Sequence, residues 1–245
     1  MEQIVADGVR RKTSAEVSIG PRLVRRLGRD AVRAIVVVGQ SPNDGDEKMN
    51  PTSVLYMSMS LDGYIAGPND EPGNPGGDGF DRLHEWMWDR TADGEYVRRR
   101  SGPAAQLWDE MDGYGAILAG RRTVEQVDHW GGDRHGVRIF VPSHRPPGPS
   151  VANYPLVTYV ADGIESAMAQ AKAAAGDRYV LVQGAYTAQR ALEAGVLDEL
   201  VIHQIPVLFG RGRRQFDVLP ARVELEIVRV IDTPEATHLR YRVRR

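Results

Sequence analysis

The chain has 245 residues, of which 42% are hydrophobic, and a formal net charge of −2. This length suits one domain of about 200 residues with an extension. The near-neutral charge gives no sign of a nucleic-acid partner, no apolar run approaches the roughly 18 residues of a membrane span, and the absence of cysteine excludes disulfides, thiolate zinc sites and a cysteine nucleophile. We expect a cytoplasmic protein with no nucleic-acid or membrane partner.

The first 48 residues differ in composition from the rest. Stretches rich in Arg and Lys at 10–12 and 22–33 precede a polar, turn-forming stretch at 39–48. Such a segment cannot bury enough apolar surface to order itself, so we expect a poorly ordered extension over 1–48 and a domain over 49–245. Met49 would then be the natural start; a basic tail that binds an acidic partner is the alternative.

From Met49 onward, strand and helix patterns alternate. Apolar runs predict strands at 54–59, 116–119, 138–141, 156–160, 179–182 and 200–205. Helical patterns occupy 82–88, 104–111, 164–175 and 187–194, and Asp162 could cap the third of these. Period-two alternation on either side of a turn at 232–236 predicts an antiparallel hairpin. These patterns predict an α/β fold of three layers, with a mostly parallel central sheet and an antiparallel C-terminal edge.

The most informative segment is the strand 179–182, which runs through Gly184 and Ala185 into the Ala-rich helical segment at 187–194. A strand that turns through glycine into a helix presents unpaired backbone N–H groups and the positive end of the helix dipole. Both features favour phosphate binding. Glycine also ends strands in ordinary turns, so an ordinary turn is the alternative interpretation.

A second segment of this type, Gly120-Arg121-Arg122-Thr123, follows the strand 116–119. Glycine lets the backbone approach a ligand closely, arginine matches phosphate oxygens, and the threonine hydroxyl can add a hydrogen bond. The alternative is a solvated basic turn in which Thr123 caps the following helix.

A third cluster, Ser143-His144-Arg145, follows the strand 138–141. Ligands of open α/β sheets bind outside the carboxyl ends of the strands. One phosphate needs only one of the three segments, whereas a dinucleotide with a pyrophosphate and a 2′-phosphate could use all of them. Because arginine suits a 2′-phosphate and no acidic ribose ligand is evident, the pattern favours NADPH over NADH.

A fourth element lies earlier in the chain, where the first strand breaks at Leu61-Asp62-Gly63 and resumes at 64–66. Considered without the other segments, it is typical of a tight turn in which Asp62 bonds the local backbone.

Together, in this order, the four segments resemble the dihydrofolate reductase-like superfamily. They resemble more closely the reductase domain of the bifunctional riboflavin-pathway deaminase/reductase and its stand-alone bacterial relatives. The resemblance covers about residues 52–245. It is carried by the sequences MSLDGYIA at 59–66, LAGRRT at 118–123, VPSHRP at 141–146, VQGA at 182–185, LDEL at 197–200 with IPVLFG at 205–210, and THLRYRV at 237–243.

The resemblance implies specific roles. It implies a cofactor-phosphate segment at Gly120, Arg121, Arg122 and Thr123, a 2′-phosphate site at Ser143 and Arg145, a pyrophosphate site at Gly184, Ala185, Tyr186 and Thr187, and a nicotinamide-side loop that begins at Ala66. Ala185 stands where the family usually has a second glycine. Tyr64 stands where the riboflavin reductases carry a basic residue, and the lack of cysteine excludes the zinc deaminase step.

The proton donor is the least defined part of the site. Dihydrofolate reductases place an acid on their first helix; the candidates here are Asp62 and Glu85, with Asp81 and His84 nearby, and each could equally be a solvated surface group. No metal site is expected, because His129 and His135 lack convergent ligands.

We therefore expect an NADPH-dependent reductase, as a homodimer, that acts on a small heterocycle of the pyrimidine or pterin kind, with the 5-amino-6-(5-phosphoribosylamino)uracil reductases as the closest type. Two alternatives stay open. One is a catalytically idle NADP-binding or dimerisation module. The other is a protein that binds a phosphosugar without redox chemistry.

Overall fold

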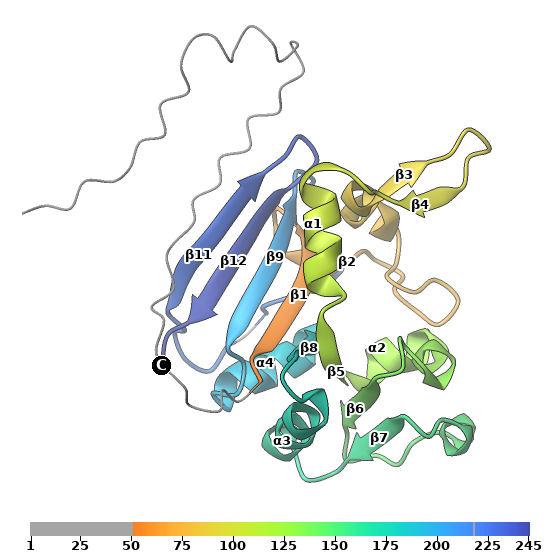
Figure 1. Cartoon of the computed structure of the whole chain (residues 1–245), viewed down its shortest axis with the longest axis vertical. Helices are drawn as coiled ribbons and strands as arrows, with labels where there is room; N and C mark the ends of the chain where they lie inside the picture. Colours follow the sequence, from red (N-terminus) through yellow and green to blue (C-terminus); the bar gives the residue numbers. More distant parts are fainter. Residues whose placement is uncertain (1–50, 218) are drawn as a thin grey trace, which may run out of the picture. The chain divides into compact units, whose positions relative to one another are not determined.

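The computed structural model describes residues 51–217 and 219–245; the predicted extension over 1–48 lies outside these residues. The chain forms an eight-stranded sheet in the order β11-β12-β9-β1-β8-β5-β6-β7 (Figure 1). Its strands are β1 (Ser53–Ser60), β5 (Tyr114–Ala119), β6 (Arg138–Pro142), β7 (Val157–Val160), β8 (Tyr179–Gln183), β9 (Glu199–Ile205), β11 (Leu225–Asp232) and β12 (Thr237–Val243). Six strands, from β9 to β7 in this order, run parallel, and β12 and β11 add an antiparallel edge. The predicted fold class is confirmed.

Helices cover both faces of the sheet, which explains why its central strands are continuously apolar. All six residues of β5 are buried, as expected for a parallel strand packed on both sides. Helices α3 (Ile164–Ala175) and α4 (Ala185–Glu193) pack on one face. Helices α1 (Gly102–Met111) and α2 (Arg121–Gln126) pack on the other. The result is the three-layer arrangement that the sequence pattern predicts.

The prediction of a helix over 82–88 is wrong. This segment forms two short 3-10 turns, η1 (Phe80–Leu83) and η2 (Glu85–Met87), and then extends into β3 (Trp88–Arg90), which pairs with β4 (Tyr96–Arg98). A seven-residue pattern is too short to form a stable helix without tertiary packing, and packing decides otherwise here because the side chains of Trp86 and Met87 are buried.

The cap of α3 also differs from the prediction. Gly163 is the N-cap residue, with φ of 94°, and no side chain caps the helix, so Asp162 does not serve that role. The remaining elements are β2 (Tyr64–Ala66), which pairs with β10 (Arg213–Arg214), and the 3-10 turns η3 (Asp128–Gly132) and η4 (Pro149–Asn153). None of the helices described is long and apolar enough to cross a membrane.

Candidate functional site

Two strand-to-helix turns pack against each other at the carboxyl edge of the sheet. The N–H of Gly120, after β5, donates to the carbonyl of Gln183 at the end of β8, at 3.1 Å. A Cβ atom at Gly120 would lie 2.8 Å from Oγ1 of Thr187, and one at Gly184 would lie 2.9 Å from Oγ1 of Thr123. Gly184 also has φ of 95° and ψ of 135°, a backbone region used almost only by glycine. We call this backbone-to-backbone contact the glycine clasp; both turns need glycine to form it.

The clasp surrounds a group of hydrogen-bond donors. The first intrahelical bond of α4 runs from the N–H of Ala188 to the carbonyl of Gly184, so the N–H groups of Ala185, Tyr186 and Thr187 have no acceptor within the helix. The hydroxyls of Thr123 and Thr187 lie beside them, and neither has a partner within the described residues. An arrangement of donors at a helix start is suited to an anion.

Arg121 holds the loop after β6 in place. Its Nη1 donates to the carbonyls of Arg145 and Pro146, each at 2.9 Å, and to Oγ of Ser143 at 3.3 Å. Its Nε donates to Glu125 at 2.6 Å. Because these partners engage Nε and Nη1 of its guanidinium, Arg121 fixes the position of this loop.

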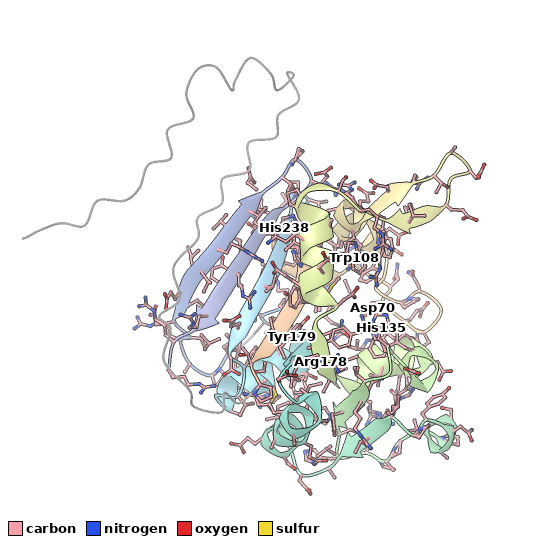
Figure 2. All side chains as sticks on the ribbon, viewed as in Figure 1. Asp70, Trp108, His135, Arg178, Tyr179 and His238 are labelled. Carbon is pink, nitrogen blue, oxygen red and sulfur yellow. The ribbon has the colours of Figure 1, made fainter. Side chains whose placement is uncertain are left out.

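Arg122 is also occupied by protein partners. It pairs with Asp70 at 3.2 Å, and the same carboxylate accepts from Nε of Arg213 at 3.3 Å and from the N–H of Gly76 at 3.0 Å (Asp70 is labelled in Figure 2). Burial tends to raise the pKa of Asp70, but the hydrogen bonds from Gln126 and Gly76 and the charge of Arg122 outweigh it, so the pKa is lowered. Arg122 therefore ties the loop that follows β2 to α2.

Among the described arginines of this site, Arg145 is the one whose guanidinium is uncommitted. Ser143 fixes its backbone, because Oγ of Ser143 accepts from the N–H of Arg145 at 3.2 Å and donates to its carbonyl at 3.1 Å. No ion pair or side-chain hydrogen bond engages the Arg145 guanidinium among residues 51–217 and 219–245. It can therefore bind an anionic group of a ligand.

These elements line one cavity of about 1390 Å³. All eleven residues predicted to bind the cofactor belong to its wall: Ala66, Gly120, Arg121, Arg122, Thr123, Ser143, Arg145, Gly184, Ala185, Tyr186 and Thr187. Small-molecule sites usually measure about 300–1,000 Å³, so this cavity has room for a dinucleotide and a second molecule.

The two predicted catalytic carboxylates lie outside the wall of this cavity. Asp62 accepts hydrogen bonds from Oγ of Ser60 at 2.6 Å and from the N–H groups of Phe209 and Gly210 at 3.0 and 2.7 Å. These bonds, the one from Ser60 first, lower the pKa of Asp62 to about 2. Glu85 is exposed and pairs with Arg82 at 3.3 Å. Asp62 thus anchors a turn, and Glu85 contributes to the surface.

Other residues of the wall carried no sequence signal. Polar groups of this kind include Ser58, Asp70, Asp112, Asp133, Arg134, Gln183 and His203; Asp81 and His84, noted as neighbours of Glu85, also line the cavity. These residues come from separate segments of the chain, and only the fold brings them together. Within the described part of the chain, no group of three or more metal-ligating side chains is present. His129 and His135 bond to Tyr159 and Tyr114, each at 2.9 Å.

Comparisons with known proteins agree with this architecture. The family described as the RibD C-terminal domain matches residues 51–239. A protein assigned to riboflavin biosynthesis from Shewanella sp. PV-4 has a similar structure, with a TM-score of 0.60 and 21% identity over 79% of this chain and 99% of that one. A pyrimidine reductase-like protein from Corynebacterium diphtheriae gives 0.50 and 15% over 80% and 92%.

The bifunctional diaminohydroxyphosphoribosylaminopyrimidine deaminase/5-amino-6-(5-phosphoribosylamino)uracil reductase of Thermotoga maritima is similar over 80% of this chain but only 57% of its own length, with a TM-score of 0.52 and 16% identity. At these identities the structural similarity establishes the fold alone. No curated protein matches the chain.

Proposed function

The chain belongs to the RibD C-terminal domain family, and on that premise we propose that it is an NADPH-dependent reductase of a small pyrimidine- or pterin-like heterocycle. One observation carries the proposal. The glycine clasp, with its unpaired donors, and the uncommitted guanidinium of Arg145 share one cavity. A single phosphate would need only one of these features, whereas NADPH carries a pyrophosphate and a separate 2′-phosphate.

The residues present fit such a cofactor. The N–H groups of Ala185, Tyr186 and Thr187, with the hydroxyl of Thr123, would hold the pyrophosphate. Because Gly120 and Gly184 have no side chains, the two turns can pack closely against each other. Arg145 would hold the 2′-phosphate, on a loop that Arg121 fixes in position. Some residues of the site would thus contact the cofactor directly, and others, such as Arg121, would hold those residues in position.

When bound, NADPH supplies a hydride to the substrate. The protein then has to orient a flat acceptor, exclude water and provide a proton. Buried Trp86 and Trp108 contribute apolar surface to the wall. Asp81 and His84 belong to the same wall, and burial lowers the pKa of His84.

We include the 5-amino-6-(5-phosphoribosylamino)uracil reductase type in this proposal. A phosphorylated substrate needs a cation, and Arg134 in the wall meets that need: it donates to Oε1 of Gln183 at 2.8 Å and lies over the ring of Trp130 at 4.5 Å. Tyr64, where relatives of this type carry a basic residue, is not part of the wall and instead stacks with Arg214 at 4.6 Å.

The test is loss of NADPH absorbance with a panel of uracil, pterin and pyrimidine substrates. Steady oxidation with one of them supports the reductase. Tight NADPH binding without turnover of any of them favours the second candidate, an idle NADP-binding module. The observation that favours this second candidate is that the two predicted catalytic carboxylates, Asp62 and Glu85, lie outside the cavity wall.

A further inference from the structure

A row of buried polar side chains crosses three strands on the sheet face that α1 covers. Ser58 on β1 is the register partner of His203 on β9, which is in turn the register partner of His238 on β12. All three are buried (His238 is labelled in Figure 2). Trp86 lies against them: its Nε1 donates to Oγ of Ser58 at 3.1 Å, and its ring centroid lies 4.3 Å from that of His203 and 4.7 Å from that of His238.

The hydrogen bonds of this row leave one nitrogen without a partner. Nδ1 of His203 lies 2.8 Å from Nδ1 of His238, so one ring donates and the other accepts. Nε2 of His203 is buried and has no partner among the described residues. An unpaired buried polar atom carries a free-energy cost and needs an explanation.

Nothing around His203 favours its charged form. Burial, followed by the charges of His238, His84 and Arg229, lowers its pKa well below the usual value. The imidazole is therefore neutral near pH 7. Depending on its tautomer, Nε2 can donate a hydrogen bond to a neutral partner or accept one from it. A carboxylate or phosphate is a poor partner for a site of this kind.

His203 belongs to the wall of the large cavity, together with Ser58, Trp86 and Trp108. The indole N–H groups of both tryptophans are already used, by Ser58 and by the carbonyl of Met87 at 2.9 Å. The tryptophans therefore offer ring surface only. A ligand against this part of the wall would meet apolar ring surface and the imidazole of His203, whose Nε2 is buried and without a partner among the described residues.

We propose that Nε2 of His203 forms a hydrogen bond with a ring heteroatom or carbonyl of the substrate, and that His238 is a positioning residue that holds the imidazole in place. The inference rests on the proposed reductase function and names the substrate class more closely: a flat heterocycle whose ring is uncharged and presents one polar atom to this wall. The cofactor phosphates bind elsewhere in the cavity, at the glycine clasp and Arg145.

The experiment measures binding of 5,6-diaminouracil, as a probe, to the full chain by calorimetry. We expect His203→Phe to weaken probe binding about tenfold or more while NADPH affinity stays within about twofold of wild type. His203→Gln keeps a polar group and should retain part of the affinity. Since His203→Phe leaves His238 unpaired, His203→Phe/His238→Phe serves as a second variant, and it should keep its melting temperature while it loses the probe.

A spectroscopic readout separates contact from general structure. In protein labelled with 15N-histidine, the probe should shift the Nε2 resonance of His203 and leave that of His129, which bonds to Tyr159, unchanged. Wild-type affinity in His203→Phe, or no probe binding to the wild type, would overturn the inference. Probe binding that depends on His203, without any NADPH binding, would instead sustain the inference and refute the reductase.

Discussion

Replacement of Gly184 by alanine tests the glycine clasp, and Gly195→Ala is its matched control. Both glycines have positive φ, of 95° and 65°. A Cβ atom at Gly195 would meet nothing within 4 Å, whereas one at Gly184 would lie 2.9 Å from Oγ1 of Thr123 and 3.5 Å from the N–H nitrogen of Gly120. The pair therefore separates backbone strain from loss of the clasp.

The expected magnitudes follow from these contacts. Alanine in the left-handed region at position 195 should lower the free energy of unfolding by about 1 kcal/mol. Alanine at position 184 meets a less accessible backbone region and a steric contact, so we expect a loss of about 2–3 kcal/mol. At roughly 2–4 °C per kcal/mol, the melting temperature should fall by about 2–4 °C and about 4–12 °C, respectively.

The decisive difference lies in cofactor binding. NADPH titration, followed by fluorescence at a temperature where both variants are folded, should show near wild-type affinity for Gly195→Ala. Gly184→Ala should bind about tenfold more weakly or worse, because displacement of Thr123 and the start of α4 removes donors from the pyrophosphate. Equal affinities in the two variants would refute the role of the clasp.

Arg121→Ala should weaken NADPH binding about tenfold, because it releases the loop that carries Arg145, and calorimetry measures this loss. An unchanged affinity would show that the loop keeps its position without Arg121. The pKa of Asp62 is lowered to about 2 from an ordinary value of 3.8, so the wild type should lose stability as the pH falls from about 4 to 2. Asp62→Asn should lack this part of the acid transition, and the same pH dependence of the melting temperature in both proteins would contradict the prediction. A chain that starts at Met49 should keep its melting temperature and NADPH affinity, and a loss of several degrees would contradict the composition argument.

Local patterns in the sequence were sufficient to predict most of the fold. Helix 164–175 is found at its predicted bounds, because an amphipathic run ended by Gly176 leaves little choice. The strand that ends before Gly184 was equally clear, since β8 is apolar and the chain must turn there. The hairpin of β3 and β4 was missed because only three residues form each strand, and burial of Trp86 decides the path of the chain before it.

The sequence predicts which residues meet at the candidate site better than it predicts what each of them does there. Strand ends bring the predicted cofactor residues to one cavity, and this follows from topology. The sequence could not show that Arg121 and Arg122 are held by protein groups, because their partners Pro146 and Asp70 lie 25 and 52 positions away. His203 was missed for the same reason: its neighbours in the cavity wall meet only in the folded sheet.

The most direct test of the account is a calorimetric comparison of NADPH and NADH binding to the wild type and to Arg145→Ala. The wild type should bind NADPH at least about tenfold more tightly, since a charged hydrogen bond to the 2′-phosphate contributes roughly 1.5–3 kcal/mol. Arg145→Ala should lose this preference while its NADH affinity stays unchanged. Equal affinities of the wild type for the two cofactors would contradict the account.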